Sequence, residues 1–151
     1  MMRFDLRRAR DTTSTTDLVR AAIDMVEWAD TRGCAIVVLS EHHASPDGYL
    51  PSPMMVASAM AARTQQVHIT IAAALLPFYD PIRLAEDMAV LDHISAGRVS
   101  YVLGLGYRAE EFAMYGVPMA QRGRIADRNL TLLLAAKTGE PVDHEGRTIQ
   151  V

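Results

Sequence analysis

The chain has 151 residues, of which 50% are apolar and 22% are charged, and its formal net charge at pH 7 is −3. This size allows one domain with a hydrophobic core. The negative net charge gives no basic surface for nucleic acid, and no Lys/Arg cluster suggests a membrane headgroup site, so we expect neither as a partner. The N-terminus lacks the apolar core of a signal peptide, and no segment has the ~18 apolar residues of a membrane span, so we expect a cytoplasmic protein. Cys34 has no second cysteine to pair with, and we expect a buried thiol.

The first third of the chain predicts a strand, a helix and a second strand. Residues 2–6 are the first strand candidate. A helix follows over about residues 14–32, because Ser14 and Asp17 have the spacing of a capping box. Apolar residues at helical spacing give this helix one buried face, made of Leu18, Ala22, Met25, Val26 and Ala29. Residues 35–39 are a continuous apolar strand, in which we expect no face in contact with water.

The rest of the chain continues this alternation of helices and strands. We expect a helix over 52–63, a strand over 67–75, a helix that begins at Asp80, a strand over 99–103, a helix over 121–137 and a hairpin over 143–151. Asp80 is a good N-cap, and Pro81 suits the first helical position. Gly97 stands where the end of that helix favours a left-handed residue.

The order strand–helix, repeated four times, predicts an α/β fold with a parallel sheet and right-handed crossovers. Two architectures fit: a small doubly wound sheet, or half of an eight-stranded (β/α) barrel. A complete barrel needs about 250 residues, so the length favours the small sheet. However, no strand is followed by a dinucleotide-binding fingerprint, and this absence argues against the small doubly wound sheet. The pattern alone leaves both architectures open.

Polar and aromatic residues follow each predicted strand. They are Arg7, Arg8 and Arg10 after the first strand, residues 40–43 after the second, residues 76–79 after the third and residues 104–108 after the fourth. The carboxyl ends of parallel strands meet at one edge of a sheet, where α/β proteins bind their ligands. We therefore expect one functional face.

His42 and His43 are the candidates for proton transfer at this face, because histidine titrates near neutral pH. Neighbouring residues that leave a strand point to opposite sides, so only one of the two is expected to face the site. The alternative is a pair that caps a helix or contacts solvent. A zinc site of a hydrolase is a weaker alternative, because the other histidines have no metal-ligand spacing, and we expect no metal.

Two runs of small residues have both a functional and a structural interpretation. Residues 104–106, Gly–Leu–Gly, could let backbone N–H groups approach a phosphate, or they could form a tight turn. Residues 72–74 are three alanines, which are unusual in a strand. They could let a flat ligand lie against the backbone, or they could fit a crowded barrel interior.

Four segments resemble the luciferase-like flavin-dependent monooxygenase family, which includes bacterial luciferase and relatives that use a deazaflavin. These segments are GCAIVVLSEHH at 33–43, ITIAAALLPFYDPIRLAED at 69–87, VLDHISAGRVSYVLGLGYRAEEFAMYGV at 90–117 and HEGR at 144–147. They follow the order and spacing of the family over nearly the whole chain. The resemblance implies that residues 1–151 are the N-terminal half of a (β/α)8 TIM barrel.

The resemblance also implies chemistry and site residues. Family members bind reduced FMN in the barrel mouth, where its reaction with dioxygen oxygenates a small-molecule substrate; the alternative cofactor is a deazaflavin that transfers hydride. His42 matches the histidine that handles protons. The cofactor-binding residues implied are Glu41, Ala72, Ala73, Leu105 and Gly106, with a cis peptide between the two alanines.

The chain departs from bacterial luciferase at two positions. Leu105 replaces the arginine that contacts the flavin phosphate, and Arg108 is the candidate substitute. Gly104 replaces the reactive cysteine. The resemblance implies a separate flavin reductase as supplier of the cofactor and a homodimer. The alternative from a different class is a non-catalytic half-barrel, which needs a partner to complete it.

Overall fold

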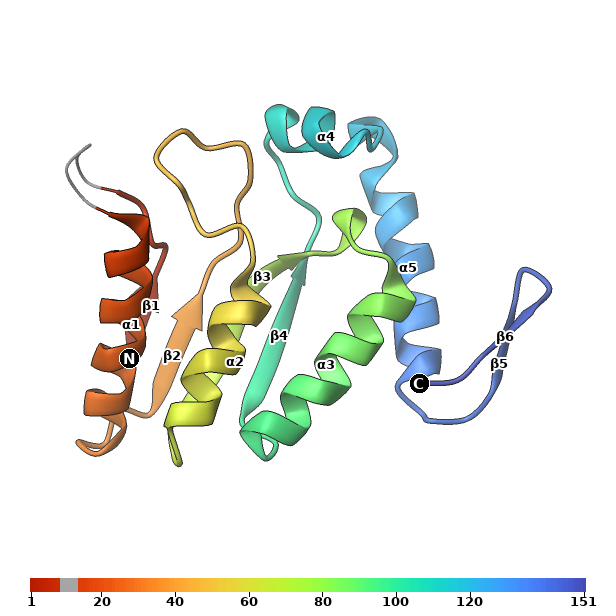
Figure 1. Ribbon diagram of the computed structural model, residues 1–151. Coiled ribbons are helices and arrows are strands. Elements are labelled where there is room, and N and C mark those ends of the chain that lie inside the picture. Colours follow the sequence, from red (N-terminus) through yellow and green to blue (C-terminus); the bar gives the residue numbers. More distant parts are fainter. Residues whose placement is uncertain (9–13) are drawn as a thin grey trace. The chain divides into compact units, whose positions relative to one another are not determined.

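The computed structural model describes residues 1–8 and 14–151 (Figure 1). Arg10, one of the polar residues predicted to follow the first strand, lies outside them. The chain divides into two compact units. The first comprises residues 1–74 and 91–103, and the second comprises residues 75–90 and 104–151.

The first unit is built on a sheet with the strand order β1-β2-β3-β4. Its elements are β1 (Met2–Phe4), α1 (Thr15–Asp30), β2 (Ile36–Leu39), α2 (Pro53–Arg63), β3 (His68–Leu75), the end of α3 (Pro81–Ser95) and β4 (Val99–Gly104). The first three strands pair in parallel, with Met2 opposite Val37 and Leu39 opposite Ile71. The predicted four parallel strands that alternate with helices are confirmed, with bounds within about two residues of those expected.

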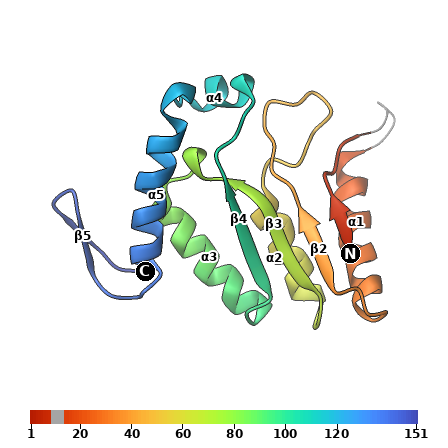
Figure 2. The ribbon, with the colours of Figure 1, turned by 180° about the vertical axis from the view of Figure 1, so that it is seen from behind.

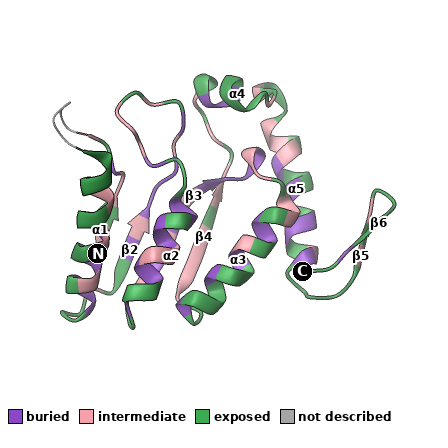
Figure 3. Ribbon diagram, in the orientation of Figure 1, coloured by how far each residue is buried: buried purple, intermediate pink, exposed green. Residues whose placement is uncertain are grey.

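Helices α1 and α2 lie on one face of this sheet (Figures 1 and 2). Val37 and Leu39 share one face of β2 and are fully buried, as are their partners on β3. Figure 3 colours the ribbon by the burial of each residue. On the other face Ile36 is 39% exposed and Val38 is half-buried. The prediction that residues 35–39 have no exposed face is therefore wrong for the described part of the first unit, whose helices cover one side only.

Helix α1 begins and ends through local capping. The Ser14 hydroxyl accepts a hydrogen bond from the Asp17 N–H at 3.4 Å, as the capping-box spacing predicts. At the other end Gly33 has φ +78°, and the Cys34 N–H donates to the Ala29 carbonyl, so the helix stops at Asp30. The Cys34 side chain is half-buried, so its expected burial is wrong.

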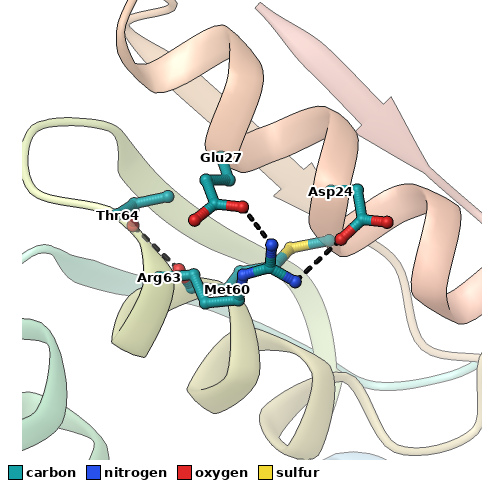
Figure 4. A network of polar contacts seen from close by, with 5 residues as sticks. All are labelled: Asp24, Glu27, Met60, Arg63 and Thr64. Carbon is teal, nitrogen blue, oxygen red and sulfur yellow. Dashed lines mark hydrogen bonds and ion pairs between the residues drawn. The ribbon is translucent and has the colours of Figure 1, made fainter.

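The buried face of α1 is narrower than the apolar pattern predicts. Ala22, Val26 and Ala29 are buried, whereas Met25 is 47% exposed because it lies at the edge of that stripe. Arg63 of α2 joins the two helices at their outer surface (Figure 4). It donates to Asp24 at 2.7 Å and also pairs with Glu27.

The second unit combines helices with one hairpin. Its elements are η1 (Leu76–Phe78), the first part of α3, α4 (Ala109–Tyr115), η2 (Met119–Gln121), α5 (Arg122–Ala136), β5 (Val142–His144) and β6 (Arg147–Ile149). The Asp80 carboxylate caps α3 by accepting from the N–H groups of Ile82 and Arg83 at 2.9 and 3.0 Å. The predicted hairpin is confirmed, and Gly146 at its tip has φ +73°. None of the helices described is long and apolar enough to cross a membrane.

Candidate functional site

The loop that follows β2 brings Glu41 and His43 together in the interior of the first unit. Glu41 is 2% exposed and His43 is 4% exposed. The His43 Nε2 atom lies 2.8 Å from Glu41 Oε1, which is hydrogen-bonding distance. A buried carboxylate and a buried imidazole satisfy each other in this way. The pair therefore fixes the backbone of the loop on both sides of His42.

His42 has a different environment from His43. Its side chain is half-buried, and its ring centroid lies 4.1 Å from that of Tyr49, with an angle of 54° between the ring planes. The His42 N–H donates to the Leu50 carbonyl at 3.0 Å. The prediction that the two histidines point in different directions agrees with this burial. An imidazole that is partly accessible can exchange protons with a ligand.

The alanines of β3 lie at the same end of the sheet as this loop. Because Leu39 pairs with Ile71, Ala72 and Ala73 come directly after the last paired position of β2. Both alanines are half-buried, and the peptide bond between them is cis, as the resemblance implies. Their methyl side chains leave the backbone open to close approach by a flat group.

A polar cluster on β3 and β4 was not predicted from the sequence. His68 Nε2 lies 3.0 Å from the Ser100 hydroxyl, which lies 3.1 Å from the Thr70 hydroxyl. His68 and Thr70 alternate with Ala72 along β3, so they share its face of the sheet. The spacing of two residues was the signal that could have identified them.

In the second unit, Gly106 lies against aromatic rings. Its φ is +73°, and a Cβ atom there would come within 3.2 Å of the Phe112 ring. Phe78 stacks on Tyr115 at 4.7 Å and meets Phe112 edge-on at 4.8 Å. These contacts support the tight-turn interpretation of residues 104–106. Leu105, the other predicted cofactor-binding residue of this unit, is 47% exposed.

Arg108 is already engaged with a carboxylate. Its Nη1 atom lies 3.5 Å from Glu111 Oε1, and the Glu111 side chain is fully buried. Glu111 lies in the first turn of α4 beside the buried Phe112. A phosphate at Arg108 would share the guanidinium with this carboxylate.

No group of three or more His, Cys, Asp and Glu side chains placed to hold a metal ion occurs among residues 1–8 and 14–151. The site defined by the first unit is therefore a set of organic groups: an accessible imidazole, a buried carboxylate–imidazole pair and a stretch of small residues. This set lies at the carboxyl ends of the strands, where parallel β/α proteins bind their ligands.

The chain belongs to the luciferase-like monooxygenase family, whose sequence model matches residues 2–151. Limonene 1,2-monooxygenase of Rhodococcus erythropolis is 30% identical over 120 residues, which are 80% of this chain and 31% of that protein. The uncharacterized protein y4wF of Sinorhizobium fredii is 34% identical over 118 residues, or 78% of this chain and 34% of that protein. The chain thus spans about a third of the length of these curated relatives.

Solved structures confirm the fold. The oxygenating constituent of 3,6-diketocamphane monooxygenase from Pseudomonas putida, in complex with FMN, superposes with a TM-score of 0.87 at 24% identity. The match covers 99% of this chain and 42% of that one. Monooxygenase RslO1 from Streptomyces bottropensis gives a TM-score of 0.84 at 25% identity, with 99% and 47% of the two chains covered. The half-barrel interpretation is confirmed over the small doubly wound sheet.

Proposed function

We propose that this chain is the N-terminal half of a flavin-dependent monooxygenase that uses reduced FMN and dioxygen to oxygenate a small molecule. The observation that carries the proposal is the arrangement at the carboxyl ends of β2 and β3, where an accessible His42 and the small pair Ala72–Ala73 leave neighbouring strands. Family membership and a fold shared with an FMN complex support it. The remaining strands of the barrel would come from polypeptide outside these 151 residues.

The residues present fit a flavin. In the first unit Ala72 and Ala73 present methyl groups to a flat ring, and Glu41 holds the adjoining loop through His43. In the second unit we assign Leu105, an exposed apolar side chain, and Gly106 to the cofactor. Reduced flavin, when bound, supplies the electrons that activate dioxygen.

His42 is the proposed catalytic residue. Its imidazole gives a proton to the reacting oxygen or takes one from it, while His43 stays bonded to Glu41 and does not compete for this role. General acid–base groups of this kind contribute about 10²–10⁴-fold to rate. His42→Ala should therefore lower turnover by about this factor and leave the binding of reduced FMN within a few-fold.

The test compares the wild-type protein, His42→Ala and the matched control His93→Ala, which removes an exposed histidine from α3. Reduced FMN is titrated anaerobically, and the oxygen reaction is followed by stopped-flow absorbance. Unchanged turnover in His42→Ala would remove His42 from the mechanism. Binding and hydride transfer with a reduced deazaflavin, in place of reduced FMN, would favour the alternative cofactor. Binding of neither would favour the non-catalytic half-barrel.

We further propose a homodimer that receives reduced FMN from a separate reductase, both on the family resemblance. Light scattering on the purified protein tests the homodimer by its mass. Turnover that depends on an added FMN reductase and reduced nicotinamide tests the supply of reduced FMN by a reductase.

A further inference from the structure

The loop that carries His42 is hydrogen-bonded to the segment after β1. Several hydrogen bonds join residues 5–8 to residues 40–50. Among them are Ser40 Oγ to Asp5 Oδ1 at 2.7 Å, Leu50 N to the Asp5 carbonyl at 3.0 Å, Arg8 N to the Asp47 carbonyl at 2.9 Å and Arg8 Nη2 to the Pro46 carbonyl at 2.9 Å. These bonds come from segments more than 30 residues apart in the sequence. The conformation of the loop therefore depends on residues that the proposed mechanism does not use.

Arg7 lies at the centre of this attachment. It forms an ion pair with Asp47 at 2.6 Å, and its guanidinium carbon lies 4.9 Å from the centroid of the Tyr49 ring. The Ser45 hydroxyl and the Arg7 guanidinium both hold the pKa of Asp47 below its usual value, so this carboxylate stays ionised near neutral pH. A guanidinium over a tyrosine face is attracted by the ring quadrupole. Arg7 thus restricts the Tyr49 ring.

The Tyr49 ring in turn contacts the imidazole of His42, with 4.1 Å between the ring centroids. A half-buried histidine has room to change rotamer, and a neighbouring aromatic ring at this distance removes part of that freedom. Proton transfer requires a group within hydrogen-bond reach in a defined orientation. The series Asp47, Arg7, Tyr49, His42 therefore runs from a surface ion pair to the proposed catalytic ring.

We propose that Tyr49 is a positioning residue for His42, and that Arg7 and Asp47 keep Tyr49 in place. This inference rests on the proposed function of His42. Loss of the Tyr49 ring should lower kcat and leave KM for reduced FMN nearly unchanged, because this ring orients a proton-transfer group. A misplacement of about 1 Å can cost about 10²-fold in rate, so we expect a fall in kcat of about 10–100-fold for Tyr49→Leu.

Three variants and two measurements test the proposal. Tyr49→Phe keeps the ring and should restore both readouts, Tyr49→Leu removes the ring, and Arg7→Gln removes the cation from an exposed side chain. Trp28→Leu is the matched control, because Trp28 and Arg32 form a cation–π pair in the same unit, on α1. The first measurement separates kcat from KM. The second is NMR of protein labelled with ¹³C at histidine, which reports the ring-current shift on His42 without any flavin.

The expected result is a displaced His42 resonance and a lower kcat in Tyr49→Leu, a smaller change of both in Arg7→Gln, and wild-type values in Tyr49→Phe and Trp28→Leu. A kcat that stays at the wild-type value in Tyr49→Leu would overturn the inference, because removal of the ring alters the ring-current shift on His42 whether or not the imidazole moves. If Tyr49→Leu fails to fold, Arg7→Gln decides by the same criteria. A displaced His42 resonance in Arg7→Gln, together with a wild-type protein that binds no reduced flavin, would contradict the proposed function while supporting the positioning of His42.

Discussion

The most direct prediction about stability concerns Asp30. This buried residue, 5% exposed, is the last of α1, and its carboxylate accepts hydrogen bonds from three consecutive backbone N–H groups immediately before β3. The donors are Gln65 at 2.8 Å, Gln66 at 3.0 Å and Val67 at 2.6 Å. The carboxylate therefore joins α1 to the sheet where no regular secondary structure would satisfy these groups.

Asp30→Asn tests how much this contact stabilises the protein. One amide oxygen can still accept from two of the N–H groups, but the NH₂ group faces the third donor. The loss of one hydrogen bond to a charged group, with an N–H left unpaired, amounts to about 2 kcal/mol. With a urea m-value of about 2 kcal/mol/M, the unfolding midpoint should fall by about 1 M. Asp24→Asn, on the exposed side of the same helix, is the control and should move the midpoint far less.

The pH dependence gives a second readout of the same contact. Burial alone would raise the pKa of Asp30, but the three N–H donors and nearby Arg98 lower it below its usual value. A carboxyl with a lowered pKa binds protons more weakly in the folded state than in the unfolded one, so its stabilisation is complete above about pH 4 and is lost as the pH falls further. Urea unfolding followed by circular dichroism should show the difference between wild type and Asp30→Asn shrinking below that pH. A difference that is small at pH 7, or that is constant down to pH 2, would refute this account of Asp30.

Two further substitutions test the turn and the end of α2. Gly106→Ala should destabilise the protein by about 1–2 kcal/mol, because φ is positive and the added Cβ meets Phe112. The control Gly123→Ala, in open space on α5, should be neutral or stabilising. Equal effects of the two substitutions in thermal unfolding would contradict this prediction. Arg98 donates four hydrogen bonds to the region where α2 ends, including the Thr64 carbonyl at 3.0 Å. Arg98→Lys should lower the free energy of unfolding by about 1–3 kcal/mol, because a single ammonium group cannot reproduce the hydrogen bonds that the two guanidinium nitrogens donate. An unchanged urea midpoint would show that these contacts contribute little to stability.

Much of the fold could be predicted because the ends of its elements are encoded locally. Asp80 caps the helix that it precedes, and Gly97 and Gly146 have the positive φ values that their positions imply. Such signals depend on neighbours within a few residues. The choice between a small sheet and half a barrel could not be made from periodicity, because both use the same alternation of elements. It required the resemblance of whole segments to a family.

The site was less predictable because its contacts do not follow a period. The pairing of Glu41 with His43 crosses a loop, where strand alternation no longer fixes which side chain turns inward. The contact between His42 and Tyr49 joins two residues that are seven positions apart in irregular backbone. Asp30 reads as an ordinary polar residue at a helix end, and its partners lie 35 to 37 residues further along the chain. The exposed face of β2 was missed because its sequence is uniformly apolar.

We propose above all that this half-barrel binds a reduced flavin. The most direct test is an anaerobic titration of the protein, at its native length, with reduced FMN, and with reduced deazaflavin in parallel, followed by exposure to dioxygen. We predict saturable binding of one reduced FMN per active site and an oxygen reaction that slows in His42→Ala. Absence of reduced FMN binding, or reaction with the deazaflavin alone, would contradict the account.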